Sequence, residues 1–278
     1  MAHMGTVIEL AMPIFLLFGR GGAVTVVGLA LMVVLHGFIT SNVPMAVPLE
    51  WNVMMVYGGF FLFGKHANVS VLAASPAVIA LLLVMCVAVP LVGNLAPRRV
   101  PFLLAMRYYA GNWAYSIWLF KKGTHTKLEK LTKSAPWVYD QMNRFYEPAV
   151  GIGLIGKVIA FRLMHLHGRA LPQLVPKAVA HLGDYEWIDG ELMAGMALGW
   201  NFGDGHLHSE QLLSSIQSQC AFEEGELRCV MVEAQPLFQP TLWYRIHDAK
   251  RGLIEQGEVS VSELRTKQPW AWEEWGGA

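Results

Sequence analysis

The first hundred residues carry only six formal charges, and this shortage constrains the fold more than any other feature of the chain. The six are Glu9, Arg20, Glu50, Lys65, Arg98 and Arg99, and the other 36 of the 42 charged residues lie beyond residue 100. A typical soluble domain is about 25% charged. We therefore predict that lipid surrounds the first third of the chain. The same asymmetry excludes a disordered protein and a nucleic-acid-binding protein with a basic face.

Apolar segments occupy most of this region, at 6–19, 23–39, 51–64 and 71–93. A membrane-spanning helix needs about 20 predominantly apolar residues. Only the last segment is comfortably long, and the first and third either span with flanking residues or form re-entrant hairpins. A fifth segment, 101–120, is aromatic but contains Arg107, so it either spans or lies along the membrane interface. The sequence predicts an all-α membrane bundle of four or five helices in a transmembrane domain, 1–122.

The positions of the positive charges predict the orientation in the membrane. A lysine cluster follows the last apolar segment, at Lys121, Lys122, Lys127 and Lys130. With four spans, Arg98 and Arg99 share its side of the membrane, and with five spans they lie opposite. Either count gives the cluster's side most of the positive charge, which marks the cytoplasm. We expect a multi-pass protein of the cell inner membrane with a cytoplasmic C-terminal half, where its three unpaired cysteines stay reduced.

The second half of the chain has a different pattern. Residues 123–182 are amphipathic, and they predict helices that pack on the membrane surface or under a soluble domain, with a loop at 171–176. Residues 183–278 predict a small cytoplasmic α+β domain. Its expected elements are a helix at 209–220 and strands at 226–234, 241–247 and 257–261, separated by glycine- and proline-containing turns.

Polar residues at the ends of apolar segments are the candidate catalytic groups. They are His36, Glu50, Asn52 and Arg107. Ionisable groups within a membrane domain are costly, and they usually face a bundle interior or a cavity. The alternative is that these groups are solvated at helix ends, with one buried ion pair between Arg107 and either Glu9 or Glu50.

The densest polar motif, GWNFGDGHLH at 199–208, contains the candidate metal ligands Asp204, His206 and His208. Two histidines at i and i+2 on an extended strand point the same way and can share one metal ion. The alternative is a loop that caps the helix beginning near Ser209, with the glycines at positive φ. An acidic cluster just upstream is a second candidate for cation binding or acid–base chemistry, although a solvated turn fits it as well. Its members are Asp184, Glu186, Asp189 and Glu191.

Several short sequence motifs of this chain resemble those of a family of unknown function among bacterial transmembrane proteins, chiefly from mycobacteria and other actinobacteria. They are HGFI at 36–39, PLEWN at 48–52, YYAGNW at 108–113, WLF at 118–120 and the glycine-rich motif at 199–208. The chain is similar to the C-terminal portion of longer members. The membrane half also faintly resembles the horizontally transferred transmembrane domain of vitamin K-dependent carboxylases, which implies an enzyme acting on a quinone or a lipid.

Three hypotheses for function follow from the sequence. The first is a membrane enzyme that acts on a lipid or quinone ligand through the polar residues of the membrane half. The second is a scaffold or accessory subunit whose cytoplasmic domain binds a protein partner. The third is a transporter, which is weaker because the sequence shows no inverted repeat. The expected surroundings are the lipid bilayer, with no nucleic acid, and the residues identify no cofactor.

Overall fold

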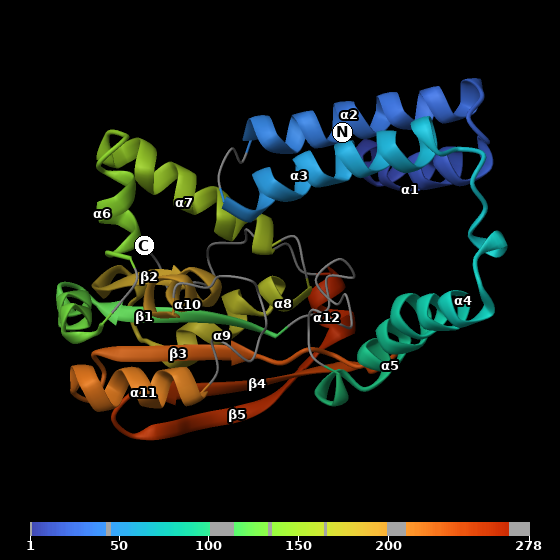
Figure 1. Cartoon of the computed structure of the whole chain (residues 1–278). Helices are drawn as coiled ribbons and strands as arrows, with labels where there is room; N and C mark the ends of the chain where they lie inside the picture. The colour runs from blue at the N-terminus through green and yellow to red at the C-terminus, as the bar shows by residue number, and fades with distance from the viewer. Residues whose placement is uncertain are drawn as a thin grey trace. The chain divides into compact units, whose positions relative to one another are not determined.

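A computed structural model describes residues 2–42, 46–100, 114–132, 135–163, 166–198 and 210–266 (Figure 1). By its internal contacts the chain divides into two units, Met1–Leu81 and Leu82–Ala278. Each unit is described by itself below.

The first unit is an apolar group of helices. It contains α1 (Ala2–Phe18), α2 (Ala23–Asn42) and α3 (Ala46–Gly59), followed by the π-helix η1 (Phe60–Lys65) and the short 3-10 helix η2 (Val71–Ala73). Helices α1 and α2 are joined by a tight turn, where Gly21 adopts a φ of 76° and donates its amide to Oγ1 of Thr25 at 2.9 Å. The small core consists of Leu16, Leu29 and Met32. Most of the remaining apolar side chains point outward, as expected of helices solvated by lipid.

The close packing of α2 against α3 depends on a glycine. A Cβ atom built on Gly59 would lie 2.3 Å from Cε of Met32, which is 1% exposed. The absence of a side chain at residue 59 therefore lets the buried Met32 fill the space between the two helices.

A long apolar helical run starts at the end of the first unit's sequence and continues into that of the second. It comprises α4 (Pro76–Leu83), the π-turn η3 (Val84–Ala88) and α5 (Val89–Leu95), and it is followed by the 3-10 helix η4 (Pro97–Arg99). The run begins at Pro76, five residues after the start of the predicted apolar segment at 71–93. Pro90 has no N–H to donate to the carbonyl of Cys86, which explains why the helix widens in the preceding turn. Of its 20 residues only Gly93 is buried, so an apolar surface faces outward on all sides.

Two described helical stretches are long and apolar enough to span a membrane, Ala23–Ser41 and Pro76–Leu95. A shorter apolar stretch, Val7–Phe18, lies within α1. The structure thus supports a membrane protein with apolar helices in its first hundred residues. The finer prediction of a bundle with four or five spanning helices is not confirmed.

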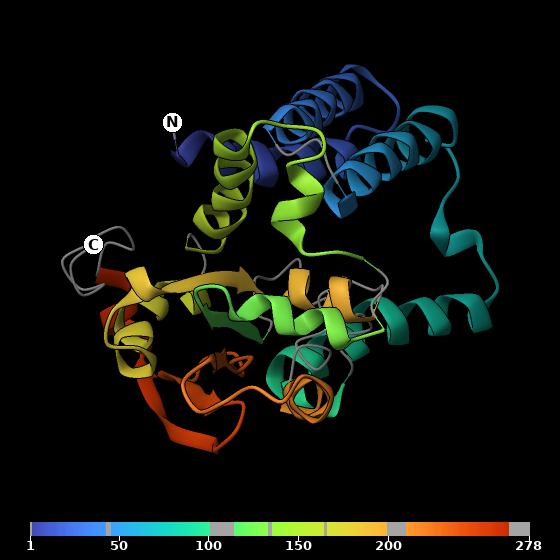
Figure 2. The same ribbon diagram turned by 90° about the vertical axis from the view of Figure 1, so that its left-hand side faces the viewer.

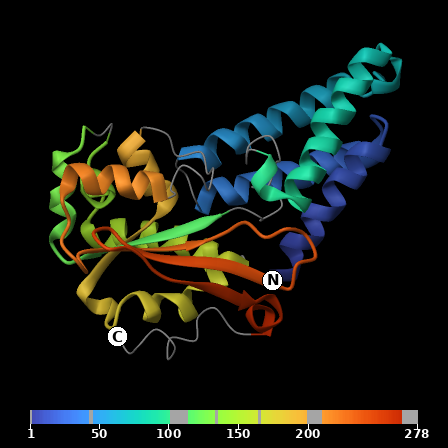
Figure 3. The same cartoon turned by 90° about the horizontal axis from the view of Figure 1, so that it is seen from below.

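The second unit is built on a five-stranded antiparallel sheet with the order β2-β1-β3-β4-β5. Its strands are β1 (Tyr115–Lys121), β2 (Tyr185–Asp189), β3 (Leu227–Val232), β4 (Thr241–Asp248) and β5 (Gly252–Ser260). Strands β3 and β4 confirm two predicted strands, whereas β5 begins five residues before the strand predicted at 257–261. Figures 2 and 3 show the sheet from two further directions. Gly252 closes the β4–β5 turn with a φ of 83°, a conformation that glycine adopts without strain.

Strand β1 corrects the prediction for the fifth apolar segment. Residues 115–120 were expected to end a membrane or interfacial helix at 101–120, but they lie in β1, which pairs with β2 on one side and β3 on the other. The predicted transmembrane domain, 1–122, therefore includes a strand of the sheet. All six side chains from Tyr115 to Phe120 are buried. A strand covered on both faces is continuously apolar, so its sequence has the same appearance as a membrane segment.

Helices cover both faces of the sheet. On one face, Tyr115, Ile117 and Leu119 pack with α8 (Leu166–Arg169), α9 (Leu171–Ala178) and α12 (Val261–Thr266). On the other face, Phe120 contacts the rings of Trp137 and Phe222, at centroid distances of 5.5 and 5.8 Å. The remaining elements are η5 (Thr124–Lys130), α6 (Val138–Met142), α7 (Pro148–Leu163), η6 (Leu182–Asp184), α10 (Gly190–Leu198) and α11 (Glu210–Cys220).

Helix α9 replaces the loop that was predicted at 171–176. Pro172 lies in the first turn, where its missing N–H has no intrahelical partner to lose. Leu171, Leu174, Val175 and Ala178 follow the spacing of one helix face, and all four are buried against the sheet. The apolar face thus outweighs the two prolines that suggested a loop.

Candidate functional site

The polar residues of the first unit meet between α2 and α3. Nδ1 of His36 lies 2.7 Å from Oδ1 of Asn52, and Nδ2 of Asn52 donates to Oγ1 of Thr40 at 2.9 Å. Asn52 is only 6% exposed. His36 and Thr40 are four residues apart on α2, so they lie on the same helix face and both reach Asn52. We call these three residues the histidine triad.

With the Asn52 amide in this orientation, the hydrogen bonds of the histidine triad favour one tautomer of the imidazole. Because Nδ2 of Asn52 is the donor to Thr40, its Oδ1 is the acceptor for His36, and Nδ1 of neutral His36 carries the proton. Nε2 then holds the free lone pair. That atom is buried and has no hydrogen-bond partner among the described residues.

This arrangement has the geometry of a general base. An imidazole whose Nδ1–H is held by a neighbouring side chain presents a basic Nε2 in a fixed direction, and it can accept a proton from a hydroxyl group. A buried nitrogen without a partner is costly, and a bound hydroxyl donor would supply that partner. Asn52 and Thr40 position His36 and do not themselves take part in proton transfer.

The other predicted catalytic residues are not brought into this triad by the described structure. Glu50 lies in α3, where only its backbone is described, and Arg107 lies outside the described residues. Glu9 is exposed on α1. The predicted ion pair of Arg107 with Glu9 or Glu50 thus stays a prediction.

The predicted metal ligands Asp204, His206 and His208 also lie outside the described residues. Within the described ranges, no group of three or more histidine, cysteine or acidic side chains could hold a metal ion. The metal site stays a prediction.

The acidic cluster upstream is a structural element and is not a solvated turn. Its central part forms strand β2, and Asp189 is 1% exposed. Oδ1 of Asp189 accepts a hydrogen bond from the amide of Glu191 at 2.7 Å, so it caps the first turn of α10. Glu186 instead pairs with His125, whose ring stacks on Trp137 at 5.0 Å. The carboxylates therefore serve separate contacts.

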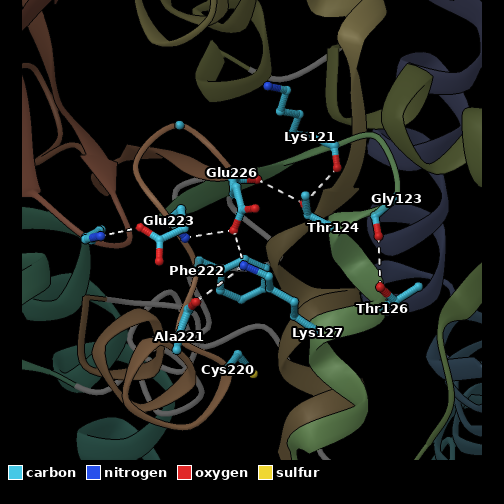
Figure 4. Close-up of polar contacts among 12 residues, drawn as sticks. Lys121, Gly123, Thr124, Thr126, Lys127, Cys220, Ala221, Phe222, Glu223 and Glu226 are labelled. Atoms are coloured by element: carbon cyan, nitrogen blue, oxygen red, sulfur yellow. Dashed lines mark hydrogen bonds and ion pairs between the residues drawn. The ribbon is translucent and has the colours of Figure 1, made fainter.

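A second polar cluster joins the β1–η5 turn to the loop before β3 (Figure 4). Lys127 pairs with the carboxylate of Glu226, and its ammonium lies 5.7 Å from the centre of the Phe222 ring. Oε2 of Glu226 also accepts the amide of Glu223 at 2.7 Å, while Thr124 donates to the carbonyl oxygens of Lys121 and Glu226. Burial alone would raise the pKa of Glu226, but the bonds from Lys127 and the Glu223 amide lower it overall. These groups are already bonded to one another, so the cluster holds two turns together.

Sequence reasoning did not identify a charged network on β4. Arg245 pairs with both Glu210 and Glu233, and Nε2 of His247 lies 2.9 Å from Oε1 of Glu210. Burial lowers the pKa of His247, and Arg245 adds to this effect, while Glu210 opposes it. The alternation of Trp243, Arg245 and His247 on one strand face was the available signal, but their acidic partners come from α11 and from the residue after β3.

The model of a family described as "Transmembrane protein of unknown function (DUF3556)" matches residues 1–275. The chain belongs to this family. No curated protein and no solved structure gives a match. Membership in the DUF3556 family agrees with the apolar helices of the first hundred residues and confirms the resemblance to a transmembrane family of unknown function.

Proposed function

We propose that this protein is a membrane enzyme that acts on a lipid- or quinone-class substrate, with His36 as the proton acceptor. The observation that supports the proposal is the buried Nε2 of His36, whose opposite ring nitrogen is held by Asn52. A substrate hydroxyl at Nε2 would satisfy this nitrogen and transfer its proton to it. The surrounding apolar helices would restrict the site to molecules that partition into a bilayer.

We also propose that the sheet lies on the cytoplasmic face. The amide of Leu237, in the β3–β4 loop, donates to the carbonyl of Asn94 at the end of the Pro76–Leu95 stretch. Arg98 lies over the ring of Trp243 on β4 at 5.0 Å. These contacts place the C-terminal end of the stretch beside the sheet. Arg98 and Arg99 would then share a side with the lysine cluster, which is the four-span arrangement, and the positive charge would face the cytoplasm.

The test compares the lipids and quinones of cells that lack the gene with those of cells complemented by variants. We expect deletion cells that express His36→Ala to keep the lipid and quinone composition of the deletion strain, because this variant lacks the proton acceptor. Asn52→Leu should impair restoration, because Nδ1–H then loses its acceptor. His66→Ala is the matched control, since this histidine lies in the same unit, where its ring contacts Phe61 at 4.5 Å.

Immunoblots of the membrane fraction must show equal amounts of each variant. Full restoration by His36→Ala would contradict the proposal, as would a deletion strain whose lipids and quinones equal those of the wild type. A different result would identify a scaffold that binds a partner through its sheet. In that case His36→Ala restores normal growth to the deletion strain, and a variant without the strands after Gly225 does not.

A further inference from the structure

A hollow opens where the Pro76–Leu95 stretch meets the sheet. Its volume is about 500 Å³, and its lining runs from Leu95 to Arg99 at the end of the helix and across the edges of β3, β4 and β5. The hollow lies wholly within the second unit. The histidine triad belongs to the first unit, and the inference does not depend on the role proposed for His36.

In a bilayer spanned by Pro76–Leu95, the hollow would lie where the bilayer ends. Pro76–Leu95 has the length and composition of a membrane span, and Arg98 and Arg99 follow its last residue. Basic residues that follow a span lie at the level of the lipid phosphates. The β3–β4 loop is fixed at the same level by the 2.9 Å bond between Leu237 and Asn94.

The tip of the β3–β4 loop presents apolar side chains at this depth. Phe238 is 93% exposed and Leu237 is 43% exposed. Phe238 also has a φ of 68°, a conformation that is strained for a residue with a large side chain. An aromatic ring held outward in a strained conformation beside a membrane span is consistent with burial among lipid headgroups and upper acyl chains.

Charges of both signs surround one aromatic ring in the hollow. Trp243 pairs with Glu258 across β4 and β5, so the two side chains project from the same face of the sheet. The guanidinium of Arg98 lies 5.0 Å from the centre of the same ring. Arg98 and Glu258 form no ion pair with any described residue, whereas Glu233 in the same lining pairs with Arg245, which Glu210 shares.

We propose that this hollow binds the headgroup of an aminophospholipid, with the phosphate at Arg98 and Arg99 and the ammonium at Glu258. A guanidinium binds a phosphate through charge-assisted hydrogen bonds, and a carboxylate accepts such bonds from a primary ammonium. Charges of both signs beside Trp243 suit a headgroup that carries both charges. A headgroup with phosphate alone would leave Glu258 unpaired beside the anion, and a quaternary ammonium could donate no hydrogen bond to it.

The experiment measures which lipids stay bound to the purified full-length protein. The protein is exchanged into detergent with equal amounts of phosphatidylethanolamine, phosphatidylglycerol and phosphatidylcholine, and retained lipids are counted by native mass spectrometry. We expect phosphatidylethanolamine to be retained about tenfold over each of the others, which corresponds to one charge-assisted hydrogen bond. Arg98→Ala combined with Arg99→Ala should abolish this retention, and Glu258→Gln should remove the preference while phosphate binding persists.

Arg251→Ala is the matched control, since Arg251 pairs with Glu224 on the surface and is absent from the lining of the hollow. Unfolding temperatures of all variants must match that of the wild type, which separates lipid loss from misfolding. Retention of phosphatidylglycerol or phosphatidylcholine equal to or above that of phosphatidylethanolamine would overturn the proposal. A wild-type preference that survives Glu258→Gln would overturn it as well.

Discussion

At the scale of single residues, the described polar groups divide into those that are satisfied by the protein and those that are not. Glu226, Lys127 and Thr124 bond to one another and to backbone groups, and this accounts for them structurally. His36 differs, because its Nδ1 is held and its buried Nε2 has no partner among the described residues. That difference is why we assign chemistry to the histidine triad and not to the larger cluster around Lys127.

The pair between Lys127 and Glu226 makes a prediction about pH. The pKa of Glu226 in the folded protein lies below its usual value of 4.5, so the pair stabilises the fold above that value and is lost as the pH falls through the folded pKa. Glu226→Gln should therefore lower stability by about 1 kcal/mol at neutral pH, a size typical of a partly exposed pair, and by much less near pH 3. The measurement is the thermal unfolding of both proteins in detergent at the two pH values.

Glu129→Gln is the control for this prediction, because Glu129 is an exposed residue of the neighbouring η5. It should show little change at either pH. An equal loss of stability for Glu226→Gln at both pH values would mean that the carboxylate's charge has no part in holding the two turns together.

At the scale of elements, β5 packs against β4 closely enough to exclude a side chain. A Cβ on Gly257 would lie 2.9 Å from the hydroxyl of Tyr244. That hydroxyl donates to Glu255 at 2.6 Å and accepts from Lys177 of α9 at 2.7 Å, so it joins the edge of the sheet to the helix that covers it. Burial, followed by the bond to Glu255, raises the pKa of Tyr244, so the phenol stays protonated and able to donate.

Gly257→Ala should destabilise the protein by about 1–3 kcal/mol, because the added methyl group must displace this hydroxyl and its two bonds. The matched control is Gly153→Ala in α7, where a Cβ meets nothing within 4 Å. There alanine should stabilise the helix by up to about 1 kcal/mol. Unfolding temperatures in detergent give both values, and a neutral Gly257→Ala would show that Tyr244 moves freely.

At the scale of the whole molecule, the membrane topology distinguishes the four-span count from the five-span count. The four-span arrangement that we propose puts Lys65 on the outer side and both Arg99 and Lys122 on the cytoplasmic side. Single cysteines can be placed at these exposed positions after Cys86, Cys220 and Cys229 are replaced by alanine. None of these three native cysteines is in a disulfide.

We expect a membrane-impermeant maleimide added to intact cells to label Lys65→Cys and to leave Arg99→Cys and Lys122→Cys unmodified until the cells are opened. Arg99→Cys and Lys122→Cys act as matched positions, because the five-span count places them on opposite sides. Labelling of one and not the other in intact cells would contradict the four-span arrangement.

The sequence by itself determined the division of the chain into an apolar first third and a polar remainder, because the cost of burying charge in lipid is visible in composition alone. It also predicted β3, β4 and β5, whose turns contain glycine and proline, and it selected His36 and Asn52 as candidates. Their side-by-side placement was not foreseeable, since 16 residues separate them in the chain and only the packing of α2 on α3 brings them together.

Only the tertiary structure decided what the buried segments of the second unit are. The residues from Tyr115 to Phe120 are apolar whether a bilayer or two layers of helices surround them, and the pairing with β2 and β3 showed the latter. Helix α9 was also not predicted, because its two prolines suggested a loop. The structure shows its apolar face packed against the sheet. A segment that is buried is apolar in sequence whether lipid or protein surrounds it, and only the three-dimensional contacts distinguish the two cases.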